Sequence, residues 1–212
     1  GMRKTAQNDN KRRRKTTAVP FFTPGTVILT PAGERVIDDL RVGDSVMTRD
    51  RGAQAIRWIG RRTLDYAHLV SNPHLRPVLL RQASLAAGLP ERDLMVSPNH
   101  RVLIEKERTA LFFSEREVLV AAKHIVNAKG IRQVDVLGVT YVHFMCARHE
   151  VVMANGIWAE SFHTVDRSLG AVGNAQRAEI FEIFPELRAT QSPEAVRKAR
   201  VRSRDIVMDH ER

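Results

Sequence analysis

Short apolar runs broken by turn residues recur along the chain from Thr26 onward. They are spaced about eight to twelve positions apart, as is typical of an all-β domain built from short strands. The run near the end of this region, 133–146, alternates over most of its length, which predicts one long strand shared by more than one part of the sheet. We therefore expect strands at residues 26–30, 44–49, 54–60, 77–82, 101–107 and 133–146.

The segment EVVMANGIWAES places Asn155-Gly156 between two apolar runs. A type I′ turn needs positive φ at both central residues, and Asn-Gly meets this need well. The segment therefore predicts a tight β-hairpin.

Helical patterns are confined to two short stretches. Residues 118–128 predict one short helix ended by Gly130. Residues 175–189 carry apolar side chains at helical spacing, and Pro185 should kink or end their first part. We expect this second helix to dock an apolar stripe on the β domain.

A chain of 212 residues can form one well-buried core with extensions, and it is too short for two large domains. The pattern of apolar and charged segments divides it into four parts. These are a basic leader that we expect to be disordered (1–18), a globular β domain (19–165), a helical extension docked on it (166–189) and a basic tail (190–212).

Membrane insertion is not predicted, because no apolar run approaches the roughly 18 residues that a spanning helix needs. The basic leader has no hydrophobic stretch behind it, so we expect no Sec-type signal. The single cysteine, Cys146, cannot form an internal disulfide, which fits a reducing compartment. We expect a cytoplasmic protein, and secretion by a non-Sec route stays open.

The formal charge of +10 is concentrated at the ends of the chain. Residues 1–20 hold seven basic residues and one acidic residue, whereas residues 189–212 hold six basic and four acidic ones. Arg12, Arg13 and Arg14 in KRRRK could bind phosphates weakly and without reading sequence. No aromatic residue lies among them to stack on bases, so a solvated leader is the simpler interpretation. A basic-tailed nucleic-acid-binding protein stays open as an alternative function.

Four segments together point to a family. They are FTPGTVILTPAGERVIDDLRVGDSVMTRD, IRWIGRR, HLRPVLLRQASLAAGLPERDLMVSPNHRVLI and YVHFMCARHEVVMANGIWAESF. In register from about Val19 to about Leu187, they resemble the bacterial Hint domains, relatives of inteins and of the Hedgehog autoprocessing domain, and most closely the subgroup called Hint type 2. The resemblance implies an all-β horseshoe with pseudo-two-fold symmetry, to which this chain adds a short C-terminal helix.

The resemblance also implies a chemistry. In this family a first-residue Cys, less often Ser, attacks the preceding carbonyl and converts a peptide bond into a thioester or ester. A Ser or Thr followed three residues later by His holds the scissile carbonyl and protonates the departing nitrogen. Here that motif stands as Ser97-Pro98-Asn99-His100, and His149 matches the family's His before the ANG turn.

The nucleophile itself is missing, because the alignment of FTPGT puts Phe21 at the position of the family's Cys. A phenyl ring has no atom that can attack a carbonyl, and the Thr23 hydroxyl lies two residues too far along the chain. The sequence therefore predicts a catalytically dead Hint domain, retained as a binding or structural module for a protein or peptide partner that it does not identify.

Two further interpretations remain open. An active self-cleaving domain could use Ser97, Cys146 or water as its nucleophile, although an unactivated strand cysteine is usually inert. Splicing is not expected, because Ala159-Glu160-Ser161 stands where inteins end in His-Asn. His100, His143 and His149 could cluster around a metal, but separate hydrogen-bonded roles are the simpler interpretation, so we expect neither metal nor cofactor.

Overall fold

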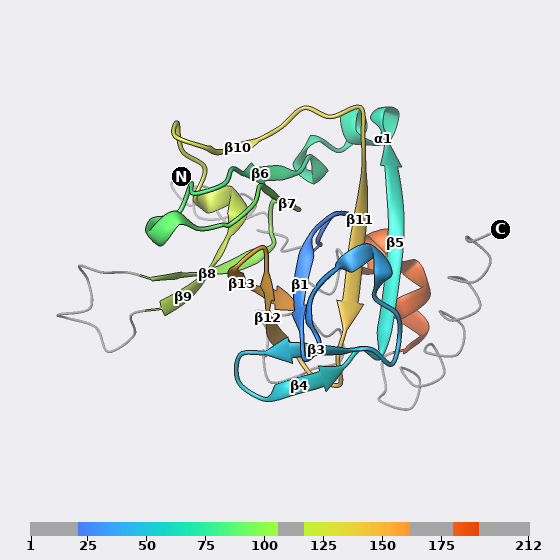
Figure 1. Cartoon of the computed structure of the whole chain (residues 1–212). Helices are drawn as coiled ribbons and strands as arrows, with labels where there is room; N and C mark the ends of the chain where they lie inside the picture. The colour runs from blue at the N-terminus through green and yellow to red at the C-terminus, as the bar shows by residue number, and fades with distance from the viewer. Residues whose placement is uncertain (1–20, 106–116, 162–179, 191–212) are drawn as a thin grey trace, which may run out of the picture.

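A computed structural model of the chain describes residues 21–105, 117–161 and 180–190, and antiparallel strands dominate its fold (Figure 1). The predicted leader with Arg12, Arg13 and Arg14 lies outside the described residues, as does nearly all of the predicted basic tail. Among the described residues, no helix is long and apolar enough to cross a membrane.

The largest sheet has eight strands. Six of them follow the order β2-β1-β12-β13-β8-β9, while β3 pairs with β12 and β4 pairs with β3. Their bounds are β1 Val27–Thr30, β2 Gly33–Val36, β3 Ser45–Thr48, β4 Gly52–Ala55, β8 Arg101–Glu105, β9 Glu117–Ala121, β12 Glu150–Ala154 and β13 Ile157–Ser161.

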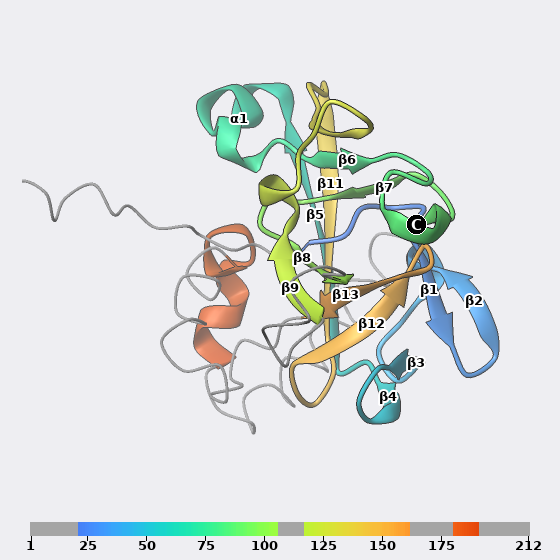
Figure 2. The same ribbon diagram turned by 90° about the vertical axis from the view of Figure 1, so that its left-hand side faces the viewer.

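A long antiparallel pair, β5 (Trp58–Asp65) and β11 (Gly138–Met145), runs beside this sheet along the length of the molecule (Figures 1 and 2). A small sheet has the order β10-β6-β7 and lies toward one end of that pair. Its strands are β6 Val78–Leu80, β7 Leu94–Val96 and β10 Ile131–Gln133.

Helices are short in the described part of the chain. The α-helix α1 (Tyr66–Ser71) follows β5, and the Asp65 side chain caps it by accepting a hydrogen bond from the His68 amide. Residues 180–183 are also α-helical. Short 3₁₀ helices occur at Ile37–Asp39, Pro73–Leu75, Ala86–Gly88, Ala122–His124 and Pro185–Thr190.

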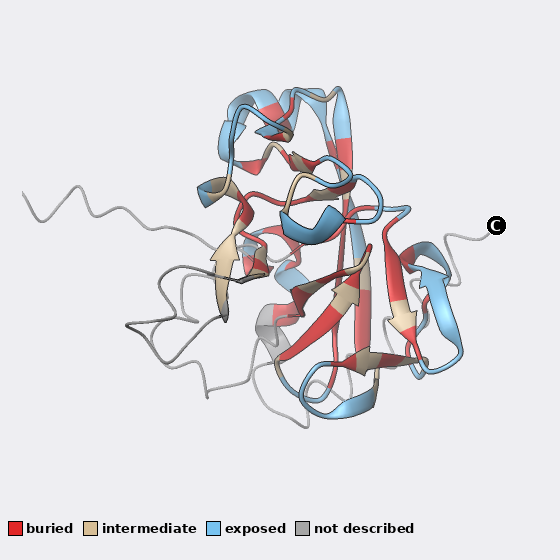
Figure 3. Ribbon diagram, turned by 60° about the vertical axis from the view of Figure 1, so that its left-hand side comes forward, coloured by how far each residue is buried: buried red, intermediate tan, exposed pale blue. Residues whose placement is uncertain are grey.

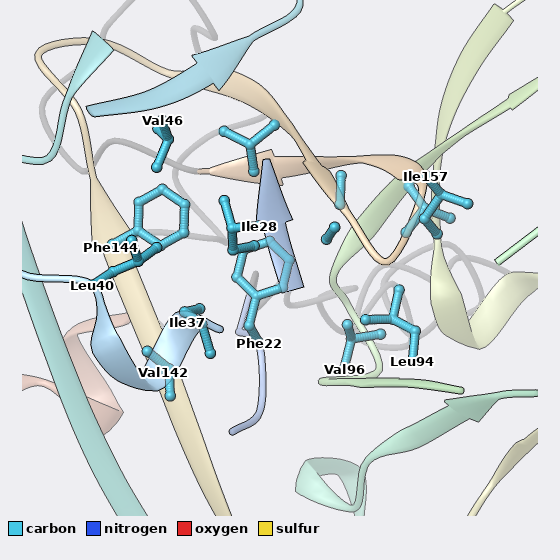
Figure 4. Close-up of a cluster of buried hydrophobic side chains, with 14 of the residues drawn as sticks. Phe22, Ile28, Ile37, Leu40, Val46, Leu94, Val96, Val142, Phe144 and Ile157 are labelled. Carbon is cyan, nitrogen blue, oxygen red and sulfur yellow. The ribbon is translucent and has the colours of Figure 1, made fainter. Parts of the chain in front are cut away.

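Strand β11 separates two hydrophobic clusters, because its alternate side chains point to opposite sides. Val142, Phe144 and Cys146 belong to the first cluster, which fills the space between the sheets. Tyr141 and Met145 belong to the second cluster. Figure 3 shows buried residues along strands of the sheets, and Figure 4 shows the first cluster in detail.

The all-β class and the Asn-Gly hairpin are confirmed. Asn155 has a φ of 48° and Gly156 a φ of 87°, and Ala154 pairs with Ile157 across the turn. Only these two residues connect β12 to β13, as a type I′ hairpin requires.

The predicted helix at 118–128 is wrong. Residues 117–121 form β9, and a single 3₁₀ turn follows at Ala122–His124. The strand pairs with β8 over five residues, from Arg101 opposite Ala121 to Glu105 opposite Glu117. Pairing with a distant strand therefore overrides the local helical pattern, as β propensity depends strongly on context.

Two of the expected strands are each divided in the structure. Residues 133–146 contain the end of β10 and all of β11, separated by a loop at 134–137. Residues 54–60 contain the end of β4 and the start of β5, because the chain turns from one sheet to the other at Ile56 and Arg57. The short elements β2, β7 and α1 were not predicted.

Candidate functional site

The first described residues, Phe21 and Phe22, lie between two pieces of sheet. The Phe22 amide donates to the Val142 carbonyl at 2.9 Å, and the Val142 amide donates to the Phe22 carbonyl at 2.8 Å. Phe22 also forms a β-bridge with Val96 of β7. This single residue therefore joins β7 to β11 and continues the small sheet into the β5–β11 pair.

The extended backbone sends the two phenyl rings to opposite sides. Phe22 points into the first cluster, where it lies among Ile28, Val96 and Val142 (Figure 4). Phe21 points into the second cluster and is completely buried. The start of the β domain is thus fixed by two side chains and by strand-like hydrogen bonds.

Ser97 and His100 both contact the backbone of Phe21. The Phe21 amide donates to Ser97 Oγ at 2.9 Å, and the Ser97 amide donates to the Phe21 carbonyl at 3.0 Å. His100 Nδ1 lies 3.0 Å from the same carbonyl oxygen. The two side chains come together because the His100 amide donates to the Ser97 carbonyl and closes a tight turn.

This geometry differs from the expected one in one respect. The family pattern predicts that the imidazole protonates the departing nitrogen of the peptide bond before Phe21. Here the Ser97 hydroxyl contacts that nitrogen, while His100 contacts the carbonyl of the next peptide bond. The Phe21 nitrogen is thus held by the Ser97 hydroxyl, which accepts its hydrogen bond.

Burial keeps His100 neutral. Removal from water lowers the pKa of His100 below its ordinary value of 6.5, and the Phe21 carbonyl and the Glu160 carboxylate oppose this shift only in part. Because a carbonyl can only accept, Nδ1 must carry the proton of the neutral ring. The imidazole therefore acts here as a hydrogen-bond donor to backbone.

The Phe21 ring is enclosed by aromatic side chains. Its centroid lies 5.5 Å from that of Tyr141, 5.6 Å from His143 and 5.5 Å from Phe184. The His143 and Phe184 rings meet it edge to face, which is the favourable arrangement for aromatic pairs. Phe21 has no exposed surface.

His149 is held in a buried ionic cluster. Its Nε2 lies 3.4 Å from Glu160 Oε1, and the fully buried Glu160 carboxylate also receives two hydrogen bonds from Arg101 Nε. Arg101 follows His100 in the chain, and the Glu160 charge acts on the His100 ring. His149 is thus linked to the Ser97–His100 turn through Glu160 and Arg101.

Cys146 lies on the wrong side of β11 to act at this site. It belongs to the first cluster, whereas the Phe21 ring belongs to the second. It is also four residues beyond Val142, or about 13 Å along the strand. Burial raises the pKa of its thiol to about 12, Glu150 adds to the rise and Arg57 opposes it. A thiol in this environment is almost fully protonated at neutral pH.

Sequence analysis did not identify two residues of this site. Glu160 was considered only because it stands where inteins have His-Asn, and a lone acid in an otherwise apolar strand was its only signal. His143 was considered only as a metal ligand, but it lies against Phe21 and Trp58. No group of three or more His, Cys, Asp or Glu residues in the described part of the chain is arranged to hold a metal ion.

Residues 20–166 match the model of the Hint domain family, which is more than half of the chain. The chain therefore belongs to the Hint domain family, a class of autoprocessing domains that includes intein-like proteins. No curated protein matches the chain in sequence.

Several solved structures are similar to the chain. The bacterial intein-like domain from Clostridium thermocellum is 13% identical with a TM-score of 0.44, over 68% of this chain and 99% of that one. A variant of the gp41-1 intein is 13% identical with a TM-score of 0.40, over 66% of this chain and 97% of that one. The MchDnaB-1 intein is 11% identical with a TM-score of 0.41, over 66% and 98%.

Proposed function

We propose that this chain is a Hint domain that has lost the acyl-shift reaction and is retained as a non-covalent binding or structural module. The observation that carries this proposal is the environment of Phe21. Its ring is completely buried among Tyr141, His143 and Phe184, at the position where the family pattern places a nucleophile. A side chain without a heteroatom cannot start the reaction, however well the neighbouring groups are placed.

The contacts of the Phe21 backbone support the view that the nucleophile has been lost while the neighbouring groups remain. Ser97 and His100 hold both polar groups of Phe21, and the nitrogen of the peptide bond before Phe21 donates to the Ser97 hydroxyl oxygen. In such a site, a thiol at position 21 would attack the Pro20 carbonyl and expel the nitrogen of residue 21. That nitrogen would take up one proton, and a thioester would replace the peptide bond.

Neither alternative nucleophile has comparable support. Cys146 is buried on the far side of β11 with a raised pKa. Ser97 is closer, but its Oγ accepts a hydrogen bond from the Phe21 amide, and the His100 imidazole contacts the Phe21 carbonyl. A hydroxyl needs a base to become a nucleophile at neutral pH.

The test is intact mass spectrometry of the wild type and of Phe21→Cys, each incubated with dithiothreitol or hydroxylamine. The wild type should stay whole. Phe21→Cys should release residues 1–20, as a hydroxamate when hydroxylamine cleaves the thioester. Phe21→Cys combined with Ser97→Ala should release much less, because the departing nitrogen loses its hydroxyl contact.

Phe22→Cys is the matched control, since it adds a thiol one residue away that points into the first cluster. It should not cleave. Removal of a buried phenyl ring costs about 3 kcal/mol or more, so folding of each variant is checked by circular dichroism before the masses are compared. Cleavage of the wild type would overturn the loss of activity. Absence of cleavage in a folded Phe21→Cys would show that more of the site than the nucleophile has gone.

A further inference from the structure

The β5–β11 pair carries an apolar face that is covered by a segment outside the family match. We call this face, formed by Phe21, Trp58, Leu64, Tyr141 and Met145, the docking face. The family match ends at residue 166, earlier than the expected end near Leu187, and the covering residues 180–187 come later in the chain. We call these residues the C-terminal segment. Its buried side chains are Ile180, Phe181, Ile183, Phe184 and Leu187.

Phe184 is the central contact of the C-terminal segment. Its ring meets Phe21 edge to face with centroids 5.5 Å apart, and it meets Trp58 at 5.2 Å and 85°. Gly60 of β5 makes room for these rings. A Cβ atom there would lie 2.4 Å from the Trp58 ring and 3.0 Å from the Phe184 ring. A buried aromatic side chain in a fitted aromatic pocket is the usual form of a binding hot spot.

Arg62 adds polar contacts that fix the direction of the segment. Its Nε donates to the Ile183 carbonyl at 3.1 Å, and its Nη2 donates to the Glu186 carboxylate at 2.7 Å. Its guanidinium also lies 5.2 Å from the centre of the Phe184 ring. One side chain of β5 therefore contacts a backbone carbonyl at the end of a helical turn, an aromatic ring and an acidic side chain two residues after that ring.

We propose that the docking face is a peptide-binding site, and that the C-terminal segment is its intramolecular ligand. The inference rests on the proposed function, because it names what the retained module binds. The partner is a protein that presents a short helical turn with an aromatic residue four positions after an aliphatic one and an acidic residue two positions later. Such a partner would displace the C-terminal segment, as amphipathic helices compete for hydrophobic grooves.

Three features of the molecule support exchange of this segment. The family match, and thus the fold it describes, ends before the segment begins. The C-terminal segment packs against the docking face and the His143 ring and accepts hydrogen bonds from Arg62, and among the described residues no strand pairing joins it to a sheet. The charge of Arg62 is complementary to an acidic ligand, and aromatic residues with arginine are the side chains most often found at binding hot spots.

The experiment uses the full chain with a protease site inserted between Gly170 and Gly173. After cleavage, a fluorescent peptide of residues 175–190 is added, and its binding is followed by anisotropy. The peptide should replace the cleaved segment. The remaining β domain, which we call the body, should keep its circular dichroism spectrum and its thermal transition whether the cleaved segment or the peptide is bound. The same peptide with Phe184→Ala should bind at least about tenfold more weakly.

Arg62→Ala in the body should weaken binding of the unchanged peptide about five- to tenfold, since it loses a charge-assisted contact and two other interactions. Arg61→Ala is the matched control. Arg61 is the preceding residue of β5, but its guanidinium donates to the Asp38 carbonyl. This variant should bind the peptide as the unchanged body does.

Three results would overturn the inference. The body could unfold when the segment leaves, which would make the segment an ordinary part of the core. The peptide could fail to bind at concentrations up to about 100 μM, which would mean that the docking face does not recognise it. The uncut chain could also elute as a dimer with exchanged segments, which would make a second copy the occupant. None of these results depends on whether Phe21→Cys cleaves, so failure of the proposed function is detected separately.

Discussion

Arg101 donates to both carboxylate oxygens of Glu160, with its Nε 3.1 Å from Oε1 and 3.0 Å from Oε2. The Glu160 side chain has no exposed surface, and only 20% of the Arg101 side chain is exposed. A buried carboxylate is tolerated only when its charge is paired, because the loss of hydration must be offset. Glu160 also contacts His149, so this ion pair connects His149 to the residue that follows the Ser97–His100 turn.

Arg101→Met should therefore be strongly destabilising. Met keeps much of the side-chain volume, but it leaves the buried carboxylate without its main partner, at a cost of about 3–5 kcal/mol. Urea unfolding followed by tryptophan fluorescence measures the change. Arg35→Met is the control, because the Arg35–Asp44 pair is exposed and separated by 3.5 Å. It should cost about 1 kcal/mol or less, and equal losses in the two variants would contradict the argument.

His100 should make the stability of the protein depend on pH. Its pKa is lowered in the folded state, so as pH falls the unfolded chain binds the proton before the folded chain does. The free energy of unfolding is then fully retained above about pH 6.5 and decreases below it. His100→Gln keeps a donor for the Phe21 carbonyl but cannot titrate, so it should lose less stability than the wild type between pH 7.5 and pH 5.5.

The comparison requires a second histidine, because other groups also respond to acid. His124 lies on the surface, after β9. His124→Gln should show the same loss of stability as the wild type over this range. If His100→Gln and the wild type lose equal stability, burial does not keep His100 neutral.

Features that depend on neighbouring residues could be predicted from the sequence. The Asn155-Gly156 hairpin needs only two residues with positive φ, and the Ser97–His100 turn needs only its own four residues, so both patterns are local. Strand β9 could not be predicted this way, because its partner β8 decides its conformation. An element could be predicted when residues close in sequence decide its conformation, and could not be predicted when a residue or strand far away in sequence decides it.

The same reasoning applies to the candidate site. The resemblance to the Hint domains singled out Ser97 and His100, and both contact the Phe21 backbone in the structure. It did not single out Glu160, whose importance comes from Arg101, 59 residues away in the chain. The docking of Phe184 on Phe21 joins the two ends of the described chain, and no local pattern indicates which aromatic residues meet.

Asn155 should contribute more than its turn conformation. Its side-chain oxygen accepts from the Val27 amide at 2.7 Å, and its side-chain nitrogen donates to the Asp93 carbonyl at 3.0 Å. Asn155→Ala leaves these buried groups unpaired and places Ala at a positive φ, so we expect a loss of about 2–4 kcal/mol in urea unfolding.

The exposed Asn127 provides the matched control. Its side-chain oxygen accepts from the Lys129 amide at 2.9 Å and, at a longer 3.3 Å, from the Ile131 amide, in a turn at the surface. Asn127→Ala should cost about 1 kcal/mol or less. A loss for Asn155→Ala no larger than this would mean that the hairpin is held by its backbone alone.

Cys146 should be chemically silent in the folded protein. Its thiol is buried and its pKa is raised to about 12, so the reactive thiolate is scarce near pH 8. Ellman's reagent should modify it only in urea, whereas the exposed Ser71→Cys variant should add one thiol that reacts at once. Cys146→Val, which keeps a small apolar side chain in the first cluster, should remain folded and whole. Rapid modification of the native wild type would show that the Cys146 thiol is accessible and would restore Cys146 as a candidate nucleophile. If the wild type also cleaved itself and Cys146→Val did not, Cys146 would be identified as the nucleophile.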